Sequence, residues 1–260
     1  PGNKGPFKII DATFETAKIG QTMPYPGVTD NVITVTLKSN KPIGSTNSVV
    51  SAITISGLTG SQTADSSTLA ITSITAGLAN IIGTTGDWNK EKGELIISVV
   101  NNQQLAADTE YKLSFKLQNP EDKQESPAVM VSVSGGSAIA KMPMKSDMKG
   151  CIHNEGDTAP LFVYGRTFLV KKIGYRTTTP QAANVVTITL TTSISLSYQS
   201  GSATKITVSG ISGMSTADSS TLAITSTHPT DFGKTAEWNK MDGSLIFTIQ
   251  NGGSLAAGTT

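Results

Sequence analysis

The sequence predicts an all-β protein made of two β-sandwich domains in tandem, and two observations carry this prediction. Residues 63–73 recur letter for letter as residues 216–226, so a period of 216 − 63 = 153 residues runs through the chain. The apolar runs are short, rich in Val, Ile and Thr, and separated by Gly, Asn, Asp and Pro turns. A period of this length corresponds to a domain, and runs of this kind are typical of half-buried strands.

Seven strands are expected in the first copy, at residues 7–14, 31–37, 52–56, 69–73, 94–100, 111–117 and 129–134. Seven short strands match the count of an immunoglobulin-like sandwich with antiparallel Greek-key sheets. Residues 90–93 and 241–243 read as tight hairpin turns, at matching places in the two copies. No segment has a sustained helical period.

The repeat also predicts the domain boundaries. We expect a first sandwich at residues 1–138, a linker at 139–158 and a second sandwich at 159–260. Residues 105–110 align with 255–260, so the second copy lacks the last two strands of the first. Two explanations stay open: the sequence is a fragment of a longer chain, or a neighbouring molecule supplies the strands.

Composition excludes several function classes. Charged residues make up 15% of the chain and the net charge is +1, which gives no electrostatic basis for binding nucleic acid or an acidic membrane. No apolar run approaches the length of a membrane span. The single cysteine, Cys151, excludes an internal disulfide framework, and we expect no cofactor.

The run Leu105-Ala106-Ala107-Asp108-Thr109-Glu110-Tyr111 resembles the tyrosine corner of fibronectin type III domains. Together with the ITISGLTG-like and LAAGT-like stretches around Trp-Asn-Lys, the chain resembles the tandem immunoglobulin-like repeats of very large surface proteins of microalgae and related protists. That resemblance covers nearly the whole chain and implies an extracellular, multi-repeat setting. It implies no particular activity.

Three features were weighed as ligand sites, and the structural interpretation is favoured for each. Trp88 and Trp238 match between copies and form either a sugar-stacking platform or core anchors. Residues 87–91 loosely resemble a calcium loop that the second copy does not keep. Residues 141–153 carry three Met, Cys151 and His153, which suit a soft metal or packing at a domain junction.

Two kinds of covalent modification are predicted. Cys151 is a candidate for a disulfide between chains. The chain has no Asn-x-Ser/Thr sequon, but it carries a Ser/Thr-Pro type cluster suited to O-linked sugars or to an ordinary proline turn, formed by Thr177, Thr178 and Thr179 ahead of Pro180.

Catalysis is not expected. The only histidines, His153 and His228, have no nucleophile in a recognisable setting. We therefore expect a structural protein, a self-assembling building block of an extracellular filament or cell-surface appendage, with an adhesin or carbohydrate-binding module as the alternative. Scarce loop aromatics favour the first. The expected inter-subunit strand is formed by Phe7, Lys8, Ile9 and Ile10.

Overall fold

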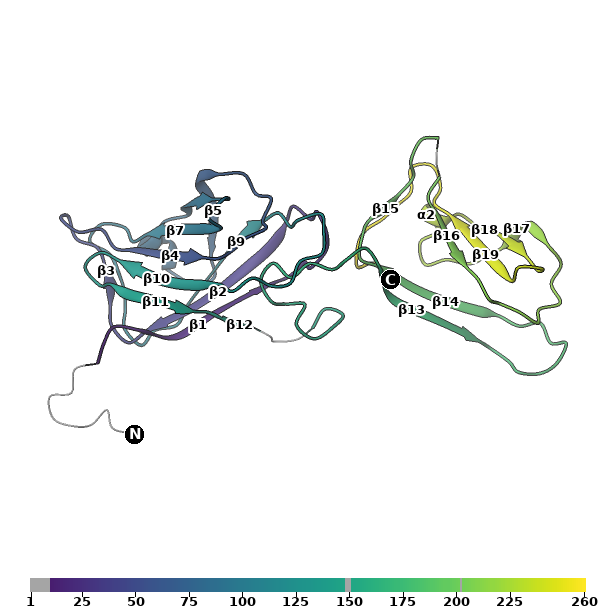
Figure 1. Ribbon diagram of the computed structural model, residues 1–260, viewed down its shortest axis with the longest axis horizontal. Helices are drawn as coiled ribbons and strands as arrows, with labels where there is room; N and C mark the ends of the chain where they lie inside the picture. The colour runs from purple at the N-terminus through teal and green to yellow at the C-terminus, as the bar shows by residue number, and fades with distance from the viewer. Residues whose placement is uncertain (1–9, 148–150, 202) are drawn as a thin grey trace. The chain divides into compact units, whose positions relative to one another are not determined.

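The computed structural model describes residues 10–147, 151–201 and 203–260. They form an all-β structure with antiparallel sheets, which confirms the predicted class. The chain divides into two compact units, unit 1 (Pro1–Gly165) and unit 2 (Arg166–Thr260) (Figure 1). No helix in the described ranges is long and apolar enough to cross a membrane.

Unit 1 alternates short strands with tight turns and contains one five-residue helix. Its elements are β1 (Phe14–Gln21), β2 (Asn31–Ser39), β3 (Ile43–Gly44), β4 (Ala52–Ser56), β5 (Ser66–Ser73), α1 (Leu78–Ile82), β6 (Thr85–Asn89), β7 (Glu94–Ser98), β8 (Gln104–Leu105), β9 (Tyr111–Leu117), β10 (Met130–Ser134), β11 (Ile139–Pro143) and β12 (Lys145–Ser146).

The main sheet of unit 1 is large and nearly closed, with the strand order β11-β10-β4-β7-β6-β5-β9-β2-β1-β12. Its two outermost strands, β11 and β12, are separated in sequence by Met144 alone, so one chain segment covers both edges. β5 turns the sheet, because its first half pairs with β6 while residues 71–73 pair with β9. Covered edges remove a template for unwanted strand pairing.

The core of unit 1 lies inside this sheet. Alternate residues of β2, β4, β7 and β9 point inward, as the period of two in a strand requires, and they bury Ile33, Ile55, Leu95 and Leu117 completely. Trp88 is buried among them, and its Nε1 donates to Thr63 O at 3.1 Å. The indole is thus satisfied as a core anchor.

Unit 2 repeats the first part of this order. Its elements are β13 (Phe168–Tyr175), β14 (Val186–Thr192), β15 (Leu196–Ser197), β16 (Lys205–Val208), β17 (Ser219–Ala223), α2 (Pro229–Phe232), β18 (Thr235–Asn239), β19 (Ser244–Thr248) and β20 (Ser254–Leu255). The pairs β13-β14 and β15-β20 and the sheet β16-β19-β18-β17 correspond to β1-β2, β3-β8 and β4-β7-β6-β5. Unit 2 has no described counterpart of β9 to β12.

Most of the predicted strands are confirmed. The bounds predicted for β4 and β9 agree with the structure, and the segments predicted near β2, β5, β7 and β10 overlap those strands. The prediction at residues 7–14 is wrong in its described part, because the strand begins at Phe14 and runs to Gln21. β1 was missed because it departs from simple alternation: a bulge lies between Phe14 and Thr16, and Ile19, Gly20 and Gln21 are all buried.

The predicted linker at residues 139–158 is also wrong. β11 pairs with β10, Ile139 is buried, and Met142 and Met144 pack against the core of unit 1. The boundary between the compact units follows Gly165 instead. A bare edge at β10 would leave backbone groups unpaired, and this segment covers it.

Candidate functional site

The strongest candidate for a contact between repeats is the segment at residues 160–164, which starts the second copy of the repeat yet belongs to unit 1. Leu161 and Val163 are fully buried, and Leu161 is part of the main core cluster. Val163 and Gln124 exchange two backbone hydrogen bonds, at 2.8 and 3.0 Å, and Gln124 Nε2 donates to Leu161 O at 2.9 Å. The start of one copy therefore completes the core of the copy before it.

Asp157 holds the loop that leads into this segment. Its side chain is fully buried, and the Tyr164 hydroxyl donates to Oδ2 at 2.9 Å. The backbone N–H groups of three consecutive residues, Ile152, His153 and Asn154, also donate to the carboxylate, with N···O distances of 2.7 to 3.1 Å. A carboxylate that accepts this many hydrogen bonds fixes the loop in one conformation.

The protonation states of this cluster are fixed near neutral pH. Burial raises the pKa of Asp157, but the backbone N–H donors outweigh burial, so the pKa lies below its ordinary value of 3.8. Burial, together with the hydrogen bond to Asp157, raises the pKa of Tyr164 to about 12. Burial and the charge of Asp157 also raise the pKa of Tyr25, whose hydroxyl lies 2.9 Å from His153 Nε2. The cluster is suited to anchoring a loop.

The sequence analysis missed the Asp157 cluster, but the repeat pointed to the segment that follows it. Pro160 and Leu161 match Pro6 and Phe7 in the repeat alignment, which placed residues 160–164 and the expected inter-subunit strand at equivalent positions. Of that expected strand, Phe7, Lys8 and Ile9 lie outside the described residues, and Ile10 is exposed.

A second candidate site is an apolar groove of about 820 Å³ in unit 2, which we call the unit 2 groove. Side chains of β14, β17, β18 and β19 line it, with others from the turns beside them. Its apolar lining includes Val186, Ile188, Leu190, Ile224, Trp238 and Phe247. An apolar surface of this kind on a sheet interior marks an unfilled core or a binding site.

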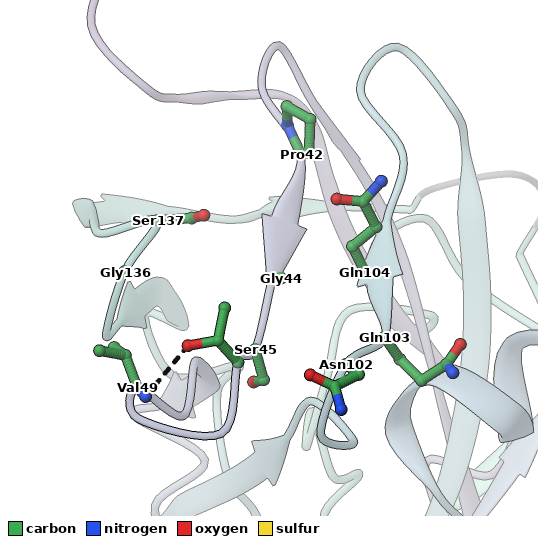
Figure 2. Close-up of a pocket in the computed structure, with 10 residues that line it drawn as sticks. Pro42, Gly44, Ser45, Val49, Asn102, Gln103, Gln104, Gly136 and Ser137 are labelled. Carbon is green, nitrogen blue, oxygen red and sulfur yellow. Dashed lines mark hydrogen bonds between the residues drawn. The ribbon is translucent and has the colours of Figure 1, made fainter.

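A third, smaller hollow of about 540 Å³ lies in unit 1 beside β3 and β8, where Figure 2 shows Gly44 and Gln104 on neighbouring strands. Thr46 and Val49 are among its lining residues, and Val49 N donates to Thr46 Oγ1 at 3.2 Å. None of its ten lining residues is aromatic or charged. The hollow therefore has no stacking surface for a sugar ring.

The predicted modification sites lie at the surface. Cys151 is exposed and has a free thiol. Thr178 and Thr179 are exposed and Thr177 is half-buried, in the turn between β13 and β14. Thr177 Oγ1 donates to Thr179 Oγ1 at 3.0 Å. Their exposure leaves them accessible to the predicted modifications.

The described residues contain no cluster of His, Cys, Asp or Glu that would support a metal site. Within residues 10–147, 151–201 and 203–260, no three His, Cys, Asp or Glu side chains gather closely enough to hold a metal ion. Met142 instead accepts a hydrogen bond from Thr13 Oγ1 at 3.6 Å, and Met148 lies outside the described residues. In the candidate calcium stretch, Asp87 and Asn89 both belong to β6.

No protein-family model matches the chain, and no curated protein matches it.

Proposed function

We propose that the protein is a structural, non-catalytic building block of an extracellular filament or cell-surface appendage, made of tandem immunoglobulin-like sandwiches. Support for the sandwich comes from the tyrosine corner, because Ala106 N donates to the Tyr111 hydroxyl oxygen at 2.9 Å. Support for the tandem comes from the matching order of β1 to β8 and β13 to β20. Partners in this proposal are further copies of the chain.

The observation that carries the proposal is that residues 160–164 pack into the core of unit 1. In the repeat, Phe7 and Ile9 correspond to Leu161 and Val163, which are fully buried there. Residues 6–10 are accordingly proposed to dock on unit 2 of a neighbouring copy, because the matching place in unit 1 is already filled by residues 160–164 of the same chain. Burial of two large apolar side chains and strand-like backbone pairing would hold successive molecules together.

The alternative, an adhesin or carbohydrate-binding module, has less support. The small hollow of Figure 2 lacks aromatic side chains, and Trp88 is buried. O-linked sugars at Thr177, Thr178 and Thr179, and a disulfide through Cys151, fit an extracellular setting and remain part of the proposal.

Electron microscopy of the native material, without denaturant, tests the proposal. We expect periodic filaments, which Phe7→Ala and Ile9→Ala shorten or abolish. Lys8→Ala is the matched control, since its counterpart Phe162 is only half-buried. Monodisperse particles, or filaments equally sensitive to all three substitutions, would overturn it.

A further inference from the structure

The unit 2 groove lies beside β14 and β17. Among the described residues of unit 2, these strands have no neighbour in the place that β9 takes beside their counterparts in unit 1, β2 and β5. In unit 1, β9 lies between β2 and β5, and β10 covers the outer side of β4. Among the described strands, β14 pairs with β13 alone, β17 with β18 alone and β16 with β19 alone. The edges of β14 and β17 therefore border the groove. In unit 1, β9 lies between the counterparts of these two strands, β2 and β5.

An identical sequence in two settings shows what the groove lacks. Residues 66–73 and 219–226 are the same eight residues, yet β5 extends to Ser73 while β17 ends at Ala223. The three residues that unit 2 leaves outside the strand correspond to those that pair with β9, namely Ile71, Thr72 and Ser73. Because the sequences are the same, the missing partner strand explains the difference.

The burial of side chains along β14 also indicates that a neighbouring strand is missing from the described part of unit 2. Ile33, Val35 and Leu37 of β2 are almost completely buried in unit 1, where β9 pairs with β2 in the same sheet. Their counterparts in β14 are Val186, Ile188 and Leu190. These side chains are only half-buried, and they line the unit 2 groove. The apolar residues of this face are kept in the sequence of unit 2 but have no cover.

We propose that the unit 2 groove binds an extended peptide strand with the side-chain pattern of β9, inserted between β14 and the segment after β17. In unit 1, Leu113, Phe115 and Leu117 of that pattern point into the core, while Lys116 is exposed. This partner deepens the proposed function, and its role in assembly rests on that function.

The register follows from the repeat. Phe115 pairs with Ile33 on one side and with Ile71 on the other, so its equivalent lies between Val186 and Ile224. Leu113 pairs with Val35, and its equivalent therefore lies opposite Ile188. An inserted strand forms backbone hydrogen bonds with both β14 and the segment after β17, and its alternate side chains fill the groove. A small apolar molecule could fill the groove but could not form these backbone hydrogen bonds.

A binding experiment on the 260-residue chain tests this inference. A synthetic peptide with the sequence of residues 110–118 is titrated into protein labelled at its Ile methyl groups and backbone amides. We expect saturable shifts of the Ile188 and Ile224 methyl resonances. We also expect at least tenfold slower hydrogen exchange at the amides of Thr225 and Thr227, because their counterparts Thr72 and Ile74 are the ones whose N–H groups face β9. The corresponding residues of unit 1 should not change.

Two controls make the result specific. A peptide with Ser at the positions of Leu113 and Phe115 should not bind. In the protein, Ile188→Asp should abolish binding, whereas Ile173→Asp, on the neighbouring strand and outside the groove lining, should leave it intact. The peptide control keeps the test decisive if Ile188→Asp prevents folding.

Three outcomes would overturn the inference: no shifts, equal shifts with the Ser-substituted peptide, or protection that appears without peptide through pairing of two protein molecules. Peptide binding by a protein that never forms filaments would support the groove and remove the building-block role. Filaments without peptide binding would do the reverse, so the two proposals fail separately.

Discussion

The two units share their turns but not the burial of their cores. Trp88 and Trp238 donate to the backbone oxygens of Thr63 and Thr216 at 3.1 and 3.2 Å. At the next turn, Lys90 N and Lys240 N donate to the Oδ1 atoms of matching aspartates, both at 2.6 Å. These contacts are the same although the surrounding sheets differ, so they depend on nearby sequence.

Burial behaves differently. Phe14 and Ile19 of β1 are 4% and 1% exposed, whereas their counterparts Phe168 and Ile173 are 37% and 59% exposed. In unit 1, Ile19 pairs with β12 and Asp147 N donates to Ile19 O at 2.7 Å. The comparison teaches that hairpins form from their own residues, while this core depends on strands that arrive later in the chain.

The largest expected effect is that of removing a core indole. Trp88→Ala leaves a cavity in a closed core and should lower the free energy of unfolding of unit 1 by about 3–5 kcal/mol. Trp238→Ala should cost clearly less, because that indole already lines an open groove. Denaturant unfolding, followed by methyl resonances assigned to each unit, measures both. Equal losses would contradict the contrast between the two cores.

The next effect compares matched isoleucines. Ile19→Ala should destabilise unit 1 by about 2–5 kcal/mol, since the side chain is buried. Ile173→Ala should change the stability of unit 2 by less than about 0.5 kcal/mol, since that side chain is largely in solvent. The same unfolding measurement applies. A large loss at Ile173 would mean that β13 is covered in solution.

Asp157 tests how the start of the second copy is held on unit 1. Asp157→Ala leaves the Tyr164 hydroxyl and three backbone N–H groups without their acceptor, at a cost of about 1–3 kcal/mol. Leu161→Ala provides a comparison, because it removes core packing and keeps the carboxylate. If Asp157→Ala left the loop amides unchanged in hydrogen exchange, the anchoring role would be wrong.

The same carboxylate predicts an acid limit. Its pKa in the folded protein lies below the ordinary 3.8, so ionisation stabilises the fold above pH 3.8, and this stabilisation is lost as the pH falls through the folded-state value. The amide resonances of Ile152, His153 and Asn154 should titrate together with a midpoint below 3.8. A midpoint above 3.8 would show that the three donors do not outweigh burial.

Local patterns predicted much of the fold. Alternating runs located β4 and β9 with their bounds, and the hairpin turn at residues 241–243 joins β18 to β19 as expected. The predictions failed where partners far away in sequence decide the outcome. β12 and residues 160–164 have weak patterns of their own, and the unit 1 surfaces that receive them are assembled from several strands. The Asp157 cluster has no spacing that reveals it.

The smallest effect concerns the corner before β9 in unit 1. Tyr111→Phe removes the oxygen that accepts from Ala106 N and should cost about 0.5–1.5 kcal/mol. The backbone of that corner also bonds through Asp108 N to Ser39 O at 2.8 Å, and Gly258 N makes the matching bond to Thr192 O at the same distance. Because this backbone bond does not involve the tyrosine hydroxyl, the corner should keep its conformation in Tyr111→Phe. Faster exchange confined to Ala106 N would agree, whereas unfolding of β9 as a whole would show that the tyrosine determines the strand's position.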